Sequence, residues 1–152
     1  MDGSNQLVVF TLDDQRYALH LSAVERVVSA VAITPLPKVP DIILGVVNVH
    51  GRIVPVADIR RRFGLPAREM SLRDQFVIAH TVRRPVILVV DRVEGIVTYS
   101  PADVIRADSI LSPIRHIEGV LKLKDGMALI HDLDGFLSLE EERSLDEAMG
   151  HA

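Results

Sequence analysis

Six histidines are the residues of this 152-residue chain whose side chains most often bind metals or transfer protons. No two of them have the HxH, HxxxH or HExxH spacing that brings imidazoles together on one strand or helix, so the sequence carries no local zinc motif. We therefore expect each to be a surface or strand residue, and we predict no metal ion and no other cofactor. The histidines are His20, His50, His80, His116, His131 and His151.

The usual arrangements for nucleophilic and phosphoryl chemistry are also missing. The chain has no cysteine, which excludes a thiol nucleophile, a thiolate metal cluster and a structural disulfide. No serine lies in a GxSxG elbow, and no GxGxxG or Walker loop is present to hold a phosphate. The adjacent acids Asp13 and Asp14 are better explained by a solvated turn than by a catalytic pair. The sequence predicts a protein that is not an enzyme, and catalysis is the weakest alternative.

The charges and the composition bear on possible partners. Consecutive helical residues spread around the helix axis, so we expect Arg60, Arg61 and Arg62 to lie on a solvated helix, with contact to an acidic partner as the alternative. The net charge of −4 argues against a general nucleic-acid binder. No apolar run approaches the roughly 18–20 residues that span a bilayer, and the first residues do not resemble a signal peptide. We expect a cytoplasmic protein that does not insert into membranes.

Hydrophobic alternation predicts the β-hairpins that would position these side chains, and the many β-branched residues favour strands. Ser22 is a plausible N-cap for a single helical turn, residues 27–33 are strand-like, and the proline-containing segment 34–40 is an extended connection. Asp58 can begin a short helix, and Ser138 with Glu141 forms a capping-box pattern for a C-terminal helix. The expected hairpins pair residues 7–12 with 15–21, 44–49 with 52–57, 75–81 with 84–90, and 117–123 with 127–130.

This strand plan occurs twice in the chain. Residues 24–28 correspond to residues 93–97, and the hairpin at 44–57 corresponds to the hairpin at 117–130. The repeat predicts two small barrels packed together, since closing each sheet removes exposed edges. Chance similarity of short hairpins is the alternative explanation. We place lobe one at about 7–65, lobe two at about 74–137 and the C-terminal helix at about 138–149, all within one domain.

The segment from Gly45 to Arg60, GVVNVHGRIVPVADIR, resembles the CheW-domain pattern G-V-x-N-[LV]-R-G-x-[IV]-x-P-V-x-D-[LI]-R. Residues 10–12 and 17–19 resemble the opening strands of that family, and Val89-Val90-Asp91-Arg92-Val93 resembles its V-V-D-x-V segment. The likeness extends over about residues 7–137, which is nearly the whole chain.

This resemblance implies a mainly β fold of two packed SH3-like five-stranded β-barrels with a binding role and no catalysis. Proteins of this family are adaptors that join the cytoplasmic tip of methyl-accepting chemoreceptors to the regulatory domain of a CheA-type histidine kinase, in chemotaxis or related signalling. A β-barrel module that binds a small ligand between its lobes is the alternative. The family matches assign partner contact to Val24, Arg26, Gly45, His50, Phe76, Ile87 and Ile96.

Two of these positions depart from the family pattern. The family usually has arginine at the position of His50 and an acidic residue at the position of Arg26. Either the surface has drifted or the adaptor serves a divergent receptor or kinase. Two arginines side by side would repel each other, whereas a neutral imidazole removes one of the charges. We therefore predict that Arg26 and His50 lie close together in space.

Overall fold

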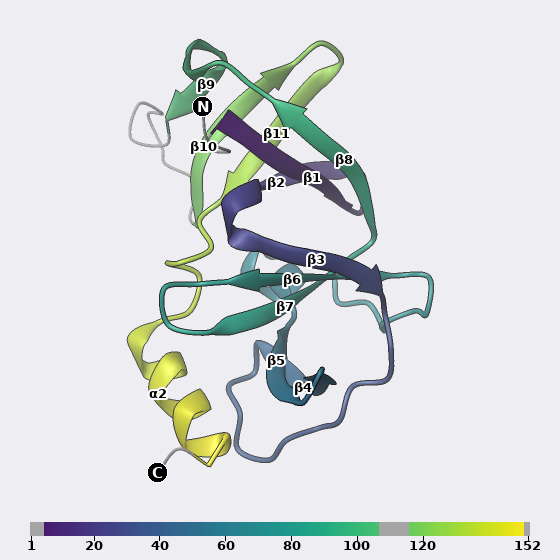
Figure 1. The fold of residues 1–152 in the computed structure, drawn as a ribbon, viewed down its shortest axis with the longest axis vertical. Helices are drawn as coiled ribbons and strands as arrows, with labels where there is room; N and C mark the ends of the chain where they lie inside the picture. Colours follow the sequence, from purple (N-terminus) through teal and green to yellow (C-terminus); the bar gives the residue numbers. More distant parts are fainter. Residues whose placement is uncertain (1–4, 107–115, 151–152) are drawn as a thin grey trace.

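Two packed β-sheets and a C-terminal helix make up the fold in the computed structural model, which describes residues 5–106 and 116–150 (Figure 1). The sheets lie one above the other along the long axis of the molecule, and strand β3 runs along the edge of the lower sheet that faces the upper one. His151 and the first four residues, which we did not expect to form a signal peptide, lie outside the described residues.

The upper sheet has the strand order β8-β1-β2-β11-β10-β9, and the lower sheet has the order β3-β6-β7-β5-β4. The four predicted hairpins are confirmed as antiparallel pairs, and one parallel contact in each sheet joins two hairpins, β2 to β11 and β7 to β5. The strands are β1 Gln6–Leu12, β2 Gln15–His20, β3 Val24–Ser29, β4 Ile43–Val49, β5 Arg52–Ala57, β6 Gln75–His80, β7 Pro85–Val90, β8 Arg92–Thr98, β9 Val104–Arg106, β10 Ile117–Leu123 and β11 Gly126–His131.

The two halves of the chain exchange strands, which corrects the predicted lobe boundaries. Strand β3 follows the β1–β2 hairpin but pairs with β6 in the lower sheet, and β8 follows the β6–β7 hairpin but pairs with β1 in the upper sheet. Residues 7–65 and 74–137 therefore do not form separate lobes, because each segment supplies strands to both sheets. The predicted repeat is present. In each half of the chain a hairpin, β1–β2 or β6–β7, lies in one sheet and the strand that follows it, β3 or β8, lies in the other sheet.

The helices begin and end where local side chains satisfy their backbone. Asp58 accepts a hydrogen bond from the backbone nitrogen of Arg60 and begins α1 (Ile59–Arg62), as predicted. Ser138 and Glu141 form the predicted capping box of α2 (Leu139–Ala148). Two short 3-10 turns, η2 (Leu21–Ala23) and η3 (Pro101–Asp103), precede β3 and β9. The prediction for Ser22 was wrong, because η2 begins after His20 without a side-chain cap.

The largest group of buried apolar side chains lies between the sheets. It joins Phe10 and Leu19 of the upper sheet to Val77 and Leu88 of the lower sheet, and Leu145 of α2 closes one side. Each fully buried side chain of this size contributes roughly 1.5–3 kcal/mol. The shared core therefore holds the surface strands of both sheets in one rigid arrangement.

Candidate protein-interaction site

Strand β3 carries the first part of the candidate site. Its residues pair with β6 along one edge of the lower sheet, and the register shifts between Val24 and Arg26. Val24 and Val27 pack against the shared core, whereas Glu25 and Arg26 are exposed. The shift at Glu25 lets these two consecutive charged side chains both reach solvent, because a bulge interrupts strict alternation between faces.

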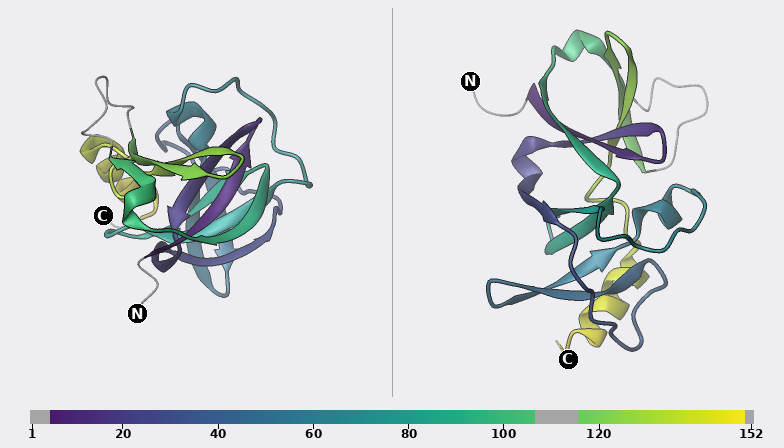
Figure 2. Two further views of the ribbon diagram at one scale, coloured as in Figure 1. Left: turned by 90° about the horizontal axis from the view of Figure 1, so that it is seen from above. Right: turned by 90° about the vertical axis from the view of Figure 1, so that its right-hand side faces the viewer.

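The hairpin of β4 and β5 supplies the second part, and it projects from the lower sheet in the right-hand view of Figure 2. Its turn has left-handed backbone at His50 (φ 50°) and Gly51 (φ 88°), the arrangement that closes two-residue hairpins. The side chain of Asn48 accepts a hydrogen bond of 2.8 Å from the Gly51 backbone nitrogen and fixes the turn. The imidazole of His50 is thereby held at the hairpin tip.

Arg26 and His50 are in direct contact, as predicted. A terminal guanidinium nitrogen of Arg26 lies 2.8 Å from Nε2 of His50. Because a guanidinium can only donate, Nε2 must accept, and the imidazole in this contact is neutral. The structure thus brings together the two predicted site residues that depart from the family pattern.

An ion pair between Glu25 and Arg52 lies next to the contact of Arg26 with His50. Glu25 accepts hydrogen bonds of 3.0 and 2.9 Å from Arg52 of β5, and His80 of β6 lies 3.5 Å from the same carboxylate. The hydrogen bond from Arg52 lowers the pKa of the Glu25 carboxyl, so this group is a stable anion. We call this group of five side chains the β3–hairpin cluster. It consists of Glu25 and Arg26 of β3, His50 of the hairpin turn, Arg52 of β5 and His80 of β6.

Gly45 has a structural role that requires glycine. Its φ of 152° is rarely adopted by other residues, and a Cβ atom there would lie 2.3 Å from the backbone oxygen of Thr34. That close approach accompanies the bridge between Thr34 and Val46, which covers the outer edge of β4. Gly45 is buried and therefore shapes this edge without presenting a side chain to a partner.

Phe76 and Ile87 are not on the surface, which corrects their assignment as contact residues. Their exposed fractions are 1% and 0%, and both side chains belong to the core of the lower sheet. They occupy inward-facing positions of β6 and β7, which strand alternation places on the buried face. Phe76 lies opposite Val28 of β3, so its influence on the surface is through packing beneath that strand.

The prediction that Ile96 and Val24 belong to the partner-contact surface agrees only in part with their positions in the structure. Ile96 is 57% exposed, but it lies on β8 in the upper sheet and not in the β3–hairpin cluster. Val24 is half-buried and packs against the shared core, so it contributes to stability as well as to the surface of β3. The structure therefore gathers only part of the predicted set into one site.

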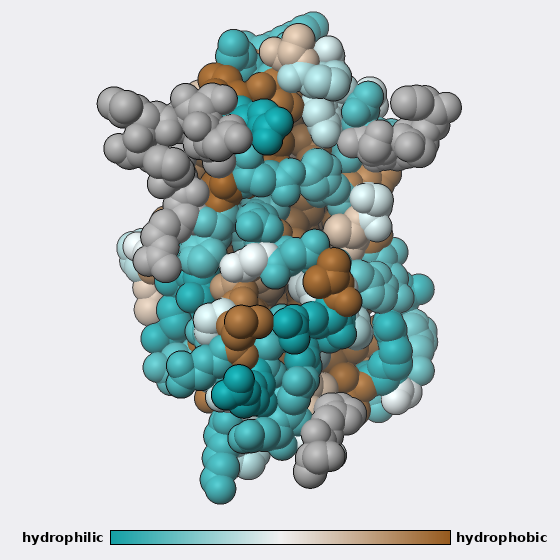
Figure 3. Space-filling view, turned by 90° about the vertical axis from the view of Figure 1, so that its left-hand side faces the viewer, coloured by the Kyte–Doolittle hydropathy of each residue, from teal (hydrophilic) through white to brown (hydrophobic). Residues whose placement is uncertain are grey.

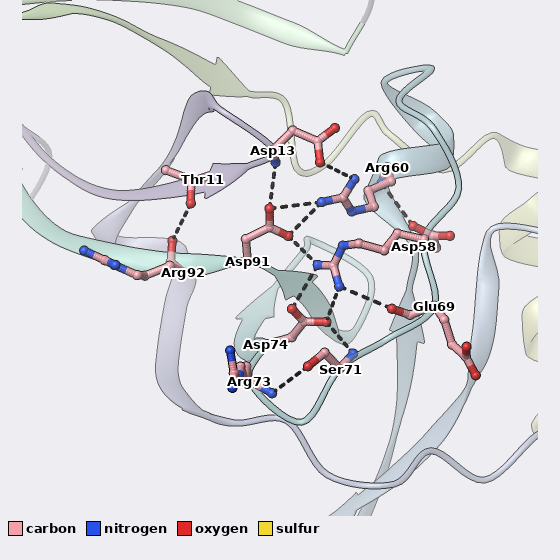
Figure 4. A network of polar contacts seen from close by, with 11 residues as sticks. Thr11, Asp13, Asp58, Arg60, Glu69, Ser71, Arg73, Asp74, Asp91 and Arg92 are labelled. Atoms are coloured by element: carbon pink, nitrogen blue, oxygen red, sulfur yellow. Dashed lines mark hydrogen bonds and ion pairs between the residues drawn. The ribbon is translucent and has the colours of Figure 1, made fainter.

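A partly buried ionic network, which we did not predict from the sequence, lies where the two sheets meet (Figure 4). Arg60 is only 6% exposed and donates to Asp91 at 2.8 and 3.0 Å, while its other terminal nitrogen pairs with Asp13 at 2.8 Å. Arg68 donates to Asp91 at 2.5 Å and to Asp74 at 2.9 Å. The expectation of a solvated Arg60 was wrong, because the first turn of α1 faces this junction. Nothing in the sequence pairs Arg60 with Asp91, which lies 31 positions further along the chain.

The network joins the β1–β2 turn, α1 and the point where β7 continues into β8. Burial alone would raise the pKa of Asp91. The hydrogen bonds from Arg60 and Arg68 outweigh this effect, so the pKa of Asp91 is below its usual value. The hydrogen bond to Asp74 raises the pKa of Arg68. Asp91, Arg60 and Arg68 are therefore all ionised. Their contacts fix the two sheets relative to each other at the point where β7 continues into β8.

His131 is the other buried titratable group of interest. It is 1% exposed, packs edge-on against Phe63 and Phe136, and neither ring nitrogen has a hydrogen-bond partner within residues 5–106 and 116–150. Burial lowers its pKa to about 3, so the ring is neutral near pH 7. Across the same ranges, no three histidine or acidic side chains are grouped in a way that would hold a metal ion.

Apolar and hydrophilic side chains are mixed on the described surface. On the face drawn in Figure 3, apolar residues appear as separate spots among hydrophilic ones. Within the part of the chain that the structure describes, no helix is long and apolar enough to cross a bilayer. Two packed sheets, a projecting hairpin and short helices define the chain as a small, mainly β protein.

Comparison with known proteins identifies the family within that class. The model of the CheW-like domain matches residues 6–141, and the chain therefore belongs to the CheW-like domain family. The chemotaxis protein CheW of Rhizobium meliloti is 30% identical over 145 residues, which cover 94% of each chain. CheW of Thermotoga maritima is 32% identical over 91 residues, or 60% of each chain.

A solved structure agrees with this assignment. The scaffolding protein TtCheW from Thermoanaerobacter tengcongensis superimposes with a TM-score of 0.82 at 28% identity, covering 91% of this chain and 95% of that protein. The mainly β, SH3-like fold with a C-terminal helix is thereby confirmed, except that one of the two sheets has six strands instead of the predicted five. The chain is an adaptor or scaffold of chemotaxis signalling.

Proposed function

We propose that this chain joins the cytoplasmic tips of methyl-accepting chemoreceptors to the regulatory domain of a CheA-type histidine kinase in the cytoplasm, without catalysing a reaction. The observation that carries the proposal is the β3–hairpin cluster, whose exposed side chains come from separate strands and are held by one another. Preorganised polar groups of this kind suit recognition of a protein surface, because little side-chain entropy is lost on binding.

Small contacts are sufficient for this function. An interface that buries less than about 1,200 Å² is weak alone, but several such interfaces in one array give high avidity. A protein with two sheets offers separate surfaces for two partners, and the shared core keeps the distance between those surfaces constant. A rigid coupling element can then transmit a change at one partner to the other.

The small-ligand alternative is not favoured. The pocket between the sheets, which is lined by residues of both sheets that include His20, His80 and His131, has a volume of about 180 Å³. Drug-sized ligands occupy pockets of roughly 300–1,000 Å³. This pocket is therefore smaller than a ligand of that size requires.

Kinase activity reconstituted from purified components tests the proposal. The probes are the CheA-type kinase and a receptor cytoplasmic fragment encoded in the same genome, assembled with and without this chain. We expect the chain to bind both probes and to raise autophosphorylation of the kinase in the receptor assembly. Binding to neither probe would overturn the proposal.

A second measurement tests the absence of catalysis. Isothermal titration calorimetry of the isolated chain with ATP, together with assays for ester and phosphoester hydrolysis, should show neither tight binding nor turnover. The reason is that the sequence contains no phosphate loop or activated nucleophile. Micromolar ATP binding would contradict this prediction.

A further inference from the structure

The positive charge of the Arg26 guanidinium is only partly balanced within residues 5–106 and 116–150, where it interacts electrostatically with Glu25 but forms no ion pair. Its contact is the neutral imidazole of His50 at 2.8 Å, and no carboxylate of residues 5–106 or 116–150 forms an ion pair with it. The adjacent carboxylate of Glu25 is engaged by Arg52 at 2.9 Å and by His80 at 3.5 Å. With neutral imidazoles, the β3–hairpin cluster therefore has two arginines and one acid, a net positive surface on a chain of net charge −4.

Arg26 is also oriented for a further contact. An arginine has five N–H donors in a planar fork, and His50 occupies only one of them. Both side chains are exposed, so the remaining donors face solvent. The preferred partner of such a fork is a carboxylate, which accepts two parallel hydrogen bonds and supplies the missing negative charge.

His50 holds the fork in place. Its position is fixed by left-handed backbone at the hairpin turn and by the hydrogen bond from Gly51 to Asn48. An arginine that is already oriented loses less side-chain entropy on binding than a free one. His50 is thus a positioning residue, because it acts through Arg26.

We propose that an aspartate or glutamate side chain of the protein partner docks on Arg26, with His50 orienting the guanidinium to receive it. This inference rests on the proposed function, because it requires a protein partner at the β3–hairpin cluster. It adds the chemistry of recognition, namely that the partner presents a carboxylate to the guanidinium of Arg26 on β3.

The experiment measures affinity for two probes, the regulatory domain of the CheA-type kinase and the receptor cytoplasmic fragment from the same genome. Arg26→Glu should weaken binding of one probe at least about tenfold, since close charge pairs at interfaces have large coupling energies. Arg26→Lys should lose less than Arg26→Glu. The matched control is Arg143→Glu, which makes the same charge change at an exposed position of α2. It should leave the affinity for that probe within about twofold.

Two further variants separate positioning from folding. His50→Ala should weaken binding several-fold, whereas His50→Gln should retain most of the affinity because its amide oxygen still accepts from Arg26. Circular dichroism melting of each variant shows whether the chain is folded at the assay temperature. A change of the partner's acid to lysine, found by scanning its Asp and Glu residues, should restore binding to Arg26→Glu.

The outcomes distinguish this inference from the proposed function. If the native chain binds the probes and Arg26→Glu binds each of them as tightly as Arg143→Glu does, the acidic-docking inference is overturned and the adaptor function stands. If the native chain binds neither probe, the proposed function fails and the inference fails with it. A partner lysine that restores binding supports both.

Discussion

Replacement of Asp91 by asparagine tests whether the buried network holds the two sheets together. Asp91 lies where β7 of the lower sheet continues into β8 of the upper sheet. It accepts from Arg60, from Arg68 and, at 2.7 Å, from the backbone nitrogen of Asp13. Asparagine keeps the shape of the side chain but removes its charge and turns an NH₂ group toward donors.

The size of the effect follows from what each arginine retains. Removing one partner of a buried ion pair usually costs about 3–5 kcal/mol. Arg60 retains Asp13, and Arg68 retains Asp74, so neither guanidinium becomes fully unpaired. We therefore expect a loss of about 2–3 kcal/mol. For a chain of this length that loss lowers the melting temperature by roughly 4–12 °C.

The pH dependence gives an independent signature. The folded-state pKa of Asp91 is below its usual value, so the stabilisation from its charge is complete above that usual value. It is lost as the pH falls from the usual value through the lowered folded-state pKa. The difference in unfolding free energy between native protein and Asp91→Asn should thus be constant from about pH 7 to pH 5 and narrow below about pH 4.

Urea unfolding at several pH values measures this difference, with Asp14→Asn as the control. Asp14 is exposed in the turn next to Asp13, so the same chemical change there should alter stability by less than about 0.5 kcal/mol. Equal stability losses in Asp91→Asn and Asp14→Asn would refute the reasoning. A difference that does not narrow in acid would show that the charge of Asp91 is not the cause.

Three more predictions concern the β3–hairpin cluster and its surroundings. His50→Arg should lower the unfolding free energy more than the double change Arg26→Glu with His50→Arg, with a coupling of roughly 0.5–3 kcal/mol in a double-mutant cycle; additive effects would show that the two positions are independent. Val24→Asp should weaken partner binding while the chain stays folded, and a variant that melts much lower but binds normally per folded molecule would make Val24 a core residue only. Gly45→Ala should destabilise the protein by at least about 2 kcal/mol more than Gly95→Ala, which has a similar φ of 145° but open space around it; similar melting temperatures would contradict this.

The local elements were predictable because their signals are local. Hairpins follow from alternation and turn residues, as at His50-Gly51, and the capping box follows from the spacing of Ser138 and Glu141. The exchange of β3 and β8 was not predictable in the same way. Either strand buries the same apolar residues whether it pairs with its own hairpin or with the other one, so the pattern of hydrophobicity is the same for both topologies.

The candidate site was partly predictable for a similar reason. The contact of Arg26 with His50 was inferred from charge compatibility between two positions, and the contact is observed. Phe76 and Ile87 were misplaced because both faces of β6 and β7 are buried, each against a different core, and an apolar run alone does not show that neither face reaches the surface. Arg60 was misplaced because an arginine usually lies in solvent, and only the three-dimensional position of Asp91 reveals the exception.

The two sets of charged residues differ in what a substitution would cost, and this difference separates folding from recognition. In the network, Arg60 is almost fully buried, so an unpaired charge there costs several kcal/mol and restricts change at both ends of the pair. In the β3–hairpin cluster, Arg26 and His50 are exposed, and a polar contact in solvent contributes less to stability than the pairing of a buried charge does. Charges on β3 and on the hairpin tip can therefore change without loss of the fold. Under the proposed docking on Arg26 the same charges contact the partner, and binding preference can then change at positions where stability imposes little constraint.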